Sequence, residues 1–401
     1  MAIYIITKQP FPNGMAGTKR ITCYAKAIIS QGIPCKVLIF TRTEIHSKKP
    51  KNIEGSGCFE GIDFEYIGGT PLRSANIFIR KANDVLDIIR LKTYLNRNLT
   101  KDDIVFGFCS EVNVINSIIK IAHHKKAKYV KELCELPFGT GKETKDTIKK
   151  RDTVLKAQYP LCDGIIAISD ALVELAKQHA SYECNVIKVP ILVDFNKYYM
   201  EDHSSEADIP YIFHSGTLFE QKDGILGMLE AFGKATQKLD KNIHFISTGT
   251  PNKSPHYHDI EKIIKDYQLE DKVIFTGYIS NEDLKEYLSK ASLVIINKYP
   301  NQQNTYCFST KLGEYLAAGK PVIITKVGEA MNWLKNGENA YIIEPNDTEL
   351  LVEAIVNAIN DPEKRNKIAL NGQKVCKECF DYRNYGKKLL HFFNNINQSD
   401  S

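Results

Sequence analysis

The sequence predicts an α/β protein built from two domains, each with a parallel β-sheet covered by helices on both faces. The chain has 401 residues, more than one hydrophobic core usually serves. Short apolar runs alternate with amphipathic segments along both halves of the chain, as in proteins built from βαβ units. The runs show little polar alternation, which is typical of strands buried on both faces of a sheet.

The first half of the chain alternates in this way up to residue 195. Strands are predicted at Ala2–Ile6, Cys35–Thr41, Asp63–Ile67, Asp103–Gly107, Lys128–Leu133, Gly164–Ile168 and Asn185–Val189. Helices, with apolar residues three and four positions apart, are predicted at Gly17–Ser30, Asn76–Asn96, Val112–His124 and Ala171–His179.

A polar stretch from Glu201 to Asp208 is typical of a linker, and the alternation resumes after it. Strands are predicted at Tyr211–Ser215, Ile243–Ser247, Lys272–Phe275, Ser292–Ile296, Pro321–Thr325 and Ala340–Ile343. Helices are predicted at Gly224–Lys238, His258–Tyr267, Asn281–Lys290, Thr310–Ala318 and Thr348–Asn360, with a last helical segment at Asn371–Asn395.

We therefore predict two Rossmann-like domains, residues 1–195 and 196–375, and a C-terminal helix in 376–401 that packs back across them. The two sheets are expected to face an interdomain cleft, because open α/β sheets bind ligands beyond the carboxyl ends of their strands.

Composition and charge narrow the class of protein. The chain is 43% hydrophobic and 25% charged, which excludes a collagen, a coiled coil and a mostly disordered chain. It has no apolar run near the ~20 residues that cross a bilayer, and its first residues resemble a strand more than a signal peptide. Its ten cysteines are scattered rather than clustered as in a disulfide framework. We expect a cytoplasmic protein.

The charge divides between the halves. Residues 1–195 hold 29 Lys and Arg against 20 Asp and Glu, a net +9, which leaves 24 against 28, or −4, for the rest. An anionic partner for the first domain is expected. The basic cluster His123–Lys128 could contact anionic lipid at the inner face of the membrane. No basic motif interleaved with aromatic residues is present, so nucleic acid is not expected as a partner.

Two loops at predicted strand–helix junctions suit an anion. Gly14 and Gly17 precede the first helix, whose N–H groups can face a phosphate, although the spacing differs from Gly-x-Gly-x-x-Gly. Gly216 and Lys222 occupy the corresponding place in the second half. An ordinary turn and a solvated lysine are the alternatives.

The segment from Cys307 to Pro321 carries the densest signal. Ser309 and Thr310 are good helix caps, and the N–H groups after them can hold phosphate oxygens. Glu314 lies one turn after Thr310, where a carboxylate can accept hydrogen bonds from the two hydroxyls of a ribose. Alternatively, Glu314 is a surface residue paired with Lys311 or Lys320.

With these residues in view, the chain resembles a family 4 glycosyltransferase of the GT-B fold, in the group 1 glycosyl transferases. The resembling segments, in the family's order, are Gly14–Gly17, Asp163–Ser169, Pro190–Asp194, Gly216–Gly224, Val273–Gly277 and Glu314–Val322. The resemblance implies two facing Rossmann-like domains and transfer of a sugar from a nucleotide-sugar, UDP- or GDP-linked, with retention at the anomeric carbon. It implies a glycan or polyprenyl-linked acceptor in cell-surface polysaccharide biosynthesis, and neither a metal nor a cofactor.

The resemblance also implies roles for individual residues. Lys222 and Glu314 would hold the donor diphosphate and the donor ribose, and Glu135 would meet the sugar as the third catalytic candidate. The remaining donor contacts would come from Gly17, Arg20, Gly216, Thr217, Gly277, Tyr278, Tyr306, Ser309 and Thr310.

The chain departs from the family pattern at two places. Thr217 stands where the family often has Arg, and Arg20 or Lys19 could supply that charge. Tyr306 stands where the family often has a first Glu, which leaves the sugar undetermined. Two alternatives stay open: a sugar-nucleotide 2-epimerase of the same architecture, and a nucleotide-binding module without catalysis.

Overall fold

The structure is a computed structural model that describes residues 1–45, 49–109, 111–139, 143–200 and 207–398. It divides into two compact units. Unit 1 consists of Met1–Gly139, Glu143–Val193 and Tyr382–Ser401, and unit 2 contains Asp194–Asp381. Among the described residues, the chain passes from unit 1 to unit 2 at Asp194 and returns to unit 1 at Tyr382.

Unit 1 is built on an eight-stranded sheet in the order β10-β9-β8-β7-β1-β2-β5-β4. All neighbouring strands run parallel except β4 and β5, which are antiparallel. The strands are β1 Ile3–Thr7, β2 Cys35–Ile39, β4 Ser56–Phe59, β5 Ile62–Tyr66, β7 Ile104–Phe108, β8 Lys128–Leu133, β9 Gly164–Ala167 and β10 Asn185–Lys188. Two short strands, β3 Glu44–Ile45 and β6 Leu72–Arg73, pair separately.

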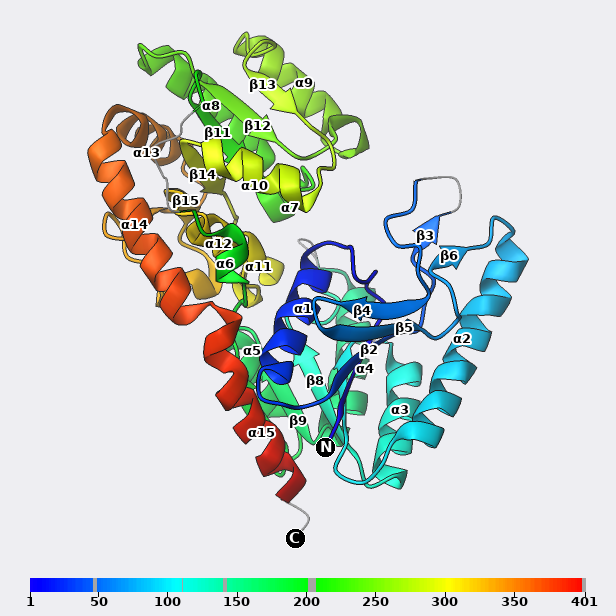
Figure 1. Ribbon diagram of the computed structural model, residues 1–401. Coiled ribbons are helices and arrows are strands. Elements are labelled where there is room, and N and C mark those ends of the chain that lie inside the picture. The colour runs from blue at the N-terminus through cyan, green and yellow to red at the C-terminus, as the bar shows by residue number, and fades with distance from the viewer. Residues whose placement is uncertain (46–48, 110, 140–142, 201–206, 399–401) are drawn as a thin grey trace. The chain divides into compact units, whose positions relative to one another are not determined.

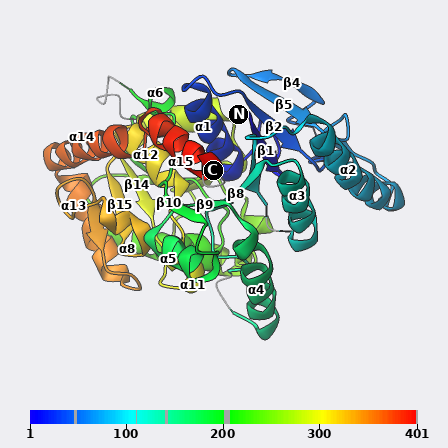
Figure 2. The same cartoon turned by 90° about the horizontal axis from the view of Figure 1, so that it is seen from below.

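Helices cover both faces of this sheet. They are α1 Ala16–Ile29, α2 Ile77–Asn98, α3 Val112–His124, α4 Lys145–Gln158, α5 Asp170–His179 and α15 Gly386–Gln398, with a 3₁₀ turn at Tyr159–Leu161. Helix α15 lies beside α1 (Figure 2). Its Phe392, Phe393 and Ile396 are buried in one cluster with apolar residues of α1 and the sheet. The C-terminal end of the chain thus completes the core of unit 1.

Unit 2 is built on a six-stranded, fully parallel sheet in the order β13-β12-β11-β14-β15-β16. Its strands are β11 Tyr211–His214, β12 His244–Ser247, β13 Val273–Phe275, β14 Leu293–Ile296, β15 Val322–Thr325 and β16 Tyr341–Ile343. The strands β11, β14 and β15 are buried at every position, because helices cover both of their faces.

The helices of unit 2 vary in length from one turn to five. They are α6 Phe195–Tyr198, α7 Glu220–Asp223, α8 Ile225–Lys238, α9 Tyr257–Asp266, α10 Asn281–Lys290, α11 Gln302–Tyr306, α12 Thr310–Ala317, α13 Thr348–Asn360 and α14 Pro362–Cys379, with 3₁₀ turns at Pro251–Lys253 and Gly328–Asn332. Helices α8 and α13 pack together over the sheet (Figure 1). On α14, the thiol of Cys376 donates to the carbonyl of Gly313 at 3.3 Å, so this cysteine helps to pack α14 against α12.

The predicted α/β class with parallel, Rossmann-like sheets is confirmed. The prediction of one helix over Asn371–Asn395 is wrong, because the chain turns at Tyr382–Tyr385 and forms two helices there. The backbone N–H of Tyr382 donates to the carbonyl of Val193, where the chain returns to unit 1. The predicted segment 376–401 is therefore divided between α14 in unit 2 and α15 in unit 1.

Candidate donor-nucleotide site in unit 2

The first part of the site is the loop that follows β11. Ser215 and Gly216 leave the strand, and Thr217 leads into the single-turn helix α7. A Cβ atom on Gly216 would lie 2.4 Å from Cε1 of His214 and 2.9 Å from a carboxylate oxygen of Asp223. Only glycine therefore fits between these two side chains.

Gly224 closes this loop and begins α8. Its φ of +63° lies in the left-handed region, which glycine adopts without strain. The side-chain amide of Asn297, just after β14, donates to the carbonyl of Gly224 at 3.0 Å. The turn that carries Lys222 and Asp223 is therefore anchored to the neighbouring strand of the sheet.

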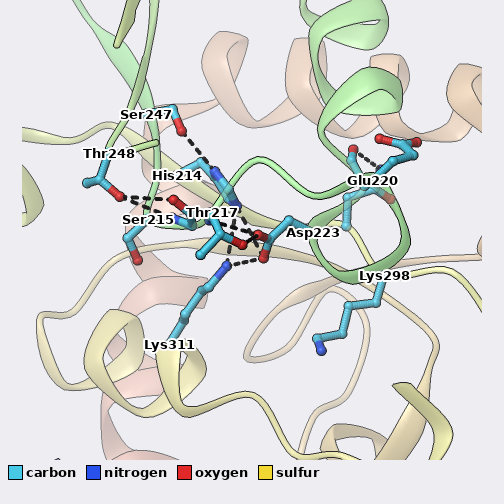
Figure 3. A network of polar contacts seen from close by, with 12 residues as sticks. His214, Ser215, Thr217, Glu220, Asp223, Ser247, Thr248, Lys298 and Lys311 are labelled. Atoms are coloured by element: carbon cyan, nitrogen blue, oxygen red, sulfur yellow. Dashed lines mark hydrogen bonds and ion pairs between the residues drawn. The ribbon is translucent and has the colours of Figure 1, made fainter. Parts of the chain in front are cut away.

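Asp223 is buried and holds the loop in place through two hydrogen bonds and an ion pair. Its Oδ2 accepts hydrogen bonds from the backbone N–H of Thr217 at 2.9 Å and from the hydroxyl of Thr217 at 3.0 Å. Its Oδ1 forms an ion pair with the ammonium of Lys311 at 2.5 Å (Figure 3). Burial alone would raise the pKa of Asp223, but Lys311 and the other donors hold that pKa well below its usual range. Asp223 is therefore an anion that ties the loop to α12.

His214, the last residue of β11, is almost completely buried at 1% exposure. Its Nδ1 lies 3.1 Å from the hydroxyl of Ser247, and its Nε2 lies 3.4 Å from the ammonium of Lys311 (Figure 3). Burial, reinforced by Lys311, lowers the pKa of His214 to about 3. The imidazole is therefore neutral at pH 7, and because an ammonium can only donate, Nε2 is the acceptor and Nδ1 carries the proton.

Helix α12 forms the opposite side of the site. Its Tyr315 accepts a hydrogen bond from the backbone N–H of Ser215 at 2.8 Å, and the hydroxyls of these two residues lie 3.0 Å apart. This contact holds α12 against the end of β11. Ser309 precedes the helix and makes no side-chain capping bond, so its hydroxyl is not used to cap the helix. The first turn of α12, with Ser309 and Thr310 partly exposed, remains open to an anion.

Three lysines gather at this end of the sheet. Burial lowers the pKa of Lys311, Asp223 opposes that effect, and the positive charges of Lys298 and Lys222 lower the pKa further. Lys298 donates to the side-chain oxygen of Asn304 at 3.1 Å, which positions it beside α11. Lys222 is exposed. Since Lys311 is occupied by Asp223, Lys222 and Lys298 are the cations best placed to meet an anionic ligand.

Glu314 lies on α12 one turn after Thr310, as predicted from its spacing. It is 7% exposed and is therefore not the surface residue of the alternative interpretation. That interpretation named two lysines as its partners. Of these, Lys311 pairs with Asp223, and Lys320 donates to the carbonyl of Ser289 at 2.7 Å. Burial raises the pKa of Tyr315, and the negative charge of Glu314 contributes to raising it.

The other predicted donor contacts of unit 2 lie on nearby loops. Gly277, with a φ of +70°, follows β13, and a Cβ atom on it would lie 3.5 Å from the hydroxyl of Thr250 in the loop after β12. Tyr278 is 60% exposed. Tyr306 ends α11, three residues before Ser309. These loops all follow parallel strands at their carboxyl ends, where an open sheet binds ligands.

The three predicted residues of the first domain lie in unit 1. Gly17 is in the first turn of α1, where a Cβ atom would come within 2.7 Å of the side chain of Gln9. Arg20 is buried and forms an ion pair with Glu132 on β8. Glu135 is exposed, two residues after the end of β8. The roles of these residues toward a donor or a sugar stay predictions.

Sequence reasoning did not single out His214, Ser247, Asp223, Lys298 or Lys311 as site residues. Asp223 stands inside the resembling segment Gly216–Gly224, next to Lys222, and Lys311 stands in the segment Cys307–Pro321, next to Thr310. Their charges could have indicated a pair across the site. His214 and Ser247 end buried strands, and in sequence nothing distinguishes them from other strand ends.

The basic cluster of residues 123–128 is partly paired within unit 1, and its contact with lipid stays a prediction. The ring of His123 lies 2.9 Å from a carboxylate oxygen of Asp163, and the ammonium of Lys128 lies 3.7 Å from its other oxygen. Lys128 is also buried. Part of the positive charge of this cluster is therefore compensated within unit 1.

The described residues contain no group of three or more His, Cys, Asp and Glu side chains placed to hold a metal ion. Among the same residues, no helix is both long and apolar enough to cross a membrane.

Residues 197–375, which include every residue of the unit 2 site, match the family model described as glycosyl transferases group 1. This segment, 179 of the 401 residues, is therefore similar to the group 1 glycosyl transferases. The chain is 21% identical over 226 residues to N-acetyl-alpha-D-glucosaminyl L-malate synthase of Bacillus anthracis. That match covers 54% of this chain and 56% of the relative, so the chain spans about half the length of such a relative.

Solved structures of glycosyltransferases share the fold over nearly the whole chain. Sucrose-phosphate synthase from Thermosynechococcus elongatus superposes with a TM-score of 0.75 at 16% identity, covering 98% of each chain. The Anabaena protein Alr3699/HepE, solved in complex with UDP and glucose, gives a TM-score of 0.71 at 16% identity, covering 98% of this chain and 99% of that one. The chain therefore has the fold of these structures, the GT-B type.

Proposed function

We propose that this protein transfers a sugar from a nucleotide-sugar donor, with retention at the anomeric carbon, and that unit 2 binds the donor. The observation that carries the proposal is the lysine cluster at the carboxyl end of β11. Lys222 and Lys298 stand there together with the open first turn of α12, in the segment that matches the family model. Cations beside a helix N-terminus suit a diphosphate.

In the proposed reaction, the bond between the anomeric carbon and the diphosphate oxygen breaks, and a bond from that carbon to an acceptor hydroxyl forms on the same face. The proton of the acceptor hydroxyl goes to the departing phosphate oxygen. Negative charge grows on the diphosphate as this bond breaks. Lys222, Lys298 and the N–H groups of α12 are fixed donors that stabilise that charge, which is how preorganised groups lower such barriers. This chemistry needs no metal ion.

Asp223 and Lys311 position these groups. Asp223 binds the backbone of Thr217 and the ammonium of Lys311, so the loop and α12 stay together whether or not a donor is present. A neutral His214 beneath them adds no charge of its own to the site at pH 7. The carboxylate of Glu314 is proposed to accept hydrogen bonds from the donor ribose.

The donor and acceptor are proposed at the level of class. A UDP- or GDP-linked sugar is proposed as the donor, and UDP is the first to test because the Anabaena neighbour was solved with it. The acceptor is proposed to be a glycan or a polyprenyl-linked glycan of the cell surface. The net +9 charge of residues 1–195 suits the diphosphate of a polyprenyl-linked acceptor.

The test begins with thermal unfolding in the presence of UDP, GDP and ADP, because a ligand that binds the folded state raises its apparent stability. Lys222→Ala is expected to weaken the affinity for the stabilising nucleotide about tenfold and to lower turnover, measured as nucleoside diphosphate released with acceptor. Lys367→Ala, an exposed lysine on α14, is the matched control and should change neither. Equal affinities and rates for the two variants would refute the assignment of the site.

A further inference from the structure

We propose that helix α2 docks unit 1 onto an anionic lipid bilayer, with the apolar stripe of its first half inserted at the interface. The apolar stripe is defined as Ile77, Phe78, Ile79, Val85, Leu86 and Ile89. This inference stands on unit 1 alone and does not depend on the proposed sugar transfer.

The apolar stripe is unusual for a soluble surface. Its large apolar side chains are between 45% exposed, at Leu86, and 79% exposed, at Phe78. Phe78, Val85 and Ile89 are spaced by seven and four residues and therefore share one face of the helix. Singly exposed apolar residues are common, but six on adjacent turns of one helix mark an interaction surface.

Only the second half of α2 is anchored in the fold. The buried residues of the helix are Asp87, Leu91 and Leu95, and no residue from Ile77 to Leu86 is buried. Figure 1 shows α2 at one edge of unit 1, beside α3. A helical segment of ten residues gains little stability in water without packing, so a surface that buries the apolar stripe would also stabilise the helix.

The charges of α2 indicate what that surface is. The helix carries five cations, Arg80, Lys81, Arg90, Lys92 and Arg97, and two anions. Both anions are already paired within unit 1. Asp84 lies 3.7 Å from Arg73, and Asp87 binds Arg42 at 3.2 Å and Arg90 at 2.8 Å.

The remaining cations have no partner among the described residues. Arg80 and Lys81 lie between Ile79 and Val85 of the apolar stripe, and Lys92 and Arg97 follow it. An apolar face bordered by Lys and Arg is what an anionic membrane interface binds. A second copy of α2 fits poorly, because pairing two such helices would bring cations together with no anion left to compensate them. The helix lies in the plane of the interface in this proposal and does not cross the bilayer.

The first experiment is co-sedimentation of the full-length protein with vesicles. Vesicles of phosphatidylcholine and phosphatidylglycerol in a 3:1 ratio, a composition of about 25% anionic lipid, are compared with pure phosphatidylcholine. We expect binding to the anionic vesicles that weakens several-fold when salt is raised from 0.05 to about 0.5 M. Phe78→Glu with Val85→Glu should weaken it at least about tenfold, because charge replaces the inserted apolar groups.

Two matched controls separate the stripe from general effects. Leu370→Glu places the same charge at an exposed leucine of α14 in unit 2 and should leave binding unchanged. Arg80→Gln with Lys81→Gln should weaken binding to anionic vesicles, whereas Lys364→Gln with Lys367→Gln, on exposed positions of α14, should not. Circular dichroism should give the same folded spectrum for every variant, because all the changed side chains are at the surface.

A second experiment reports on insertion directly. Trp333 is the single tryptophan of the chain, so Phe78→Trp in a Trp333→Phe background provides a single probe on the stripe. Its emission should shift to the blue when anionic vesicles are added. The proposal is overturned if the emission does not shift, or if Phe78→Glu with Val85→Glu binds vesicles as the parent does. It is also overturned if the parent does not bind vesicles but forms a dimer, measured by light scattering, and these substitutions abolish the dimer.

Discussion

The carboxylate of Asp223 and the ammonium of Lys311 lie 2.5 Å apart, and this ion pair joins two segments separated by 88 residues. Asp223 ends the loop after β11, and Lys311 stands in the first turn of α12. Asp223 also binds the backbone of Thr217. The pair therefore holds the two sides of the candidate donor site at a fixed separation.

Asp223→Asn should destabilise unit 2, because it leaves Lys311 with an uncompensated charge in a largely buried position. We expect the free energy of unfolding to fall by about 3 kcal/mol, measured by urea denaturation. Asp266→Asn breaks an exposed ion pair with Lys262 on α9 and should cost only about 0.3–0.5 kcal/mol. Adding Lys311→Met to Asp223→Asn should recover part of the loss. An Asp223→Asn variant as stable as the Asp266→Asn control would contradict this role.

Because His214 is buried in its neutral form, we expect the free energy of unfolding to depend on pH. Its pKa is lowered to about 3 by burial and by Lys311, whereas in the unfolded chain it has its ordinary value of 6.5. As the pH falls below 6.5, the unfolded state takes up a proton that the folded state does not, so stability is lost in acid and complete above 6.5. His214→Gln removes this proton uptake. Between pH 7 and pH 5 the variant should lose about 2 kcal/mol less unfolding free energy than the parent.

The measurement is urea denaturation at pH 7, 6 and 5. His258→Gln is the matched control, because its ring is 94% exposed and its replacement should leave the pH dependence unchanged. If His214→Gln and His258→Gln lose stability equally on acidification, His214 is not buried in its neutral form.

Glu314 should distinguish ribose from deoxyribose. A hydrogen bond to a charged acceptor is worth about 1.5–3 kcal/mol, so the parent should bind the ribonucleoside diphosphate roughly 10- to 100-fold more tightly than its 2′-deoxy form. Glu314→Ala should bind the two forms equally. Isothermal titration calorimetry measures both affinities, with Glu363→Ala, an exposed residue of α14, as the control. A Glu314→Ala variant that keeps the preference for ribose would place the ribose elsewhere.

Glu132 should be essential to the stability of unit 1. It lies on β8 and forms a buried ion pair with Arg20 of α1, in which Nε of Arg20 donates at 3.1 Å. Glu132→Gln leaves a buried guanidinium without its counter-charge, and we expect a loss of about 3–5 kcal/mol by thermal or urea unfolding.

The control for Glu132 is Glu65→Gln, which breaks a pair with Lys36 in which both side chains are about a third exposed, and should cost less than about 1 kcal/mol. Replacing both Arg20 and Glu132 by Met should restore much of the stability, because no charge is then buried alone. Equal losses in Glu132→Gln and Glu65→Gln would show that the buried pair contributes little.

Much of the fold could be predicted from local pattern. The predicted helices Val112–His124, Asn281–Lys290 and Thr348–Asn360 and the strand Lys128–Leu133 have the bounds that the structure shows. The three helices carry apolar residues three and four positions apart, a pattern that a sequence displays directly. The short strands β3, β4 and β6 and the one-turn helices α6 and α7 were not predicted, because so few residues carry no measurable period.

Helix α4 and the turn between α14 and α15 were missed for another reason. Of the fourteen residues of α4, only Val154, Leu155 and Gln158 are buried. The helical spacing of apolar residues that predicts a helix from sequence is therefore almost absent. The turn at Tyr382 is stabilised by a bond to Val193, which is 189 residues earlier in the chain.

The sequence by itself determined the α/β class, most of the strands and helices and the family resemblance. It also placed Lys222 and Thr310 at the starts of helices and Glu314 one turn after Thr310. Only the tertiary structure decided that Lys311 forms an ion pair with Asp223, that His214 is buried and neutral, and that the apolar stripe of α2 is exposed. Periodicity and capping depend on neighbours within a few residues, and a sequence displays those directly. Ion pairs, burial and exposed faces depend on which distant segments the folded chain brings together, and these partners appear only once the chain has folded.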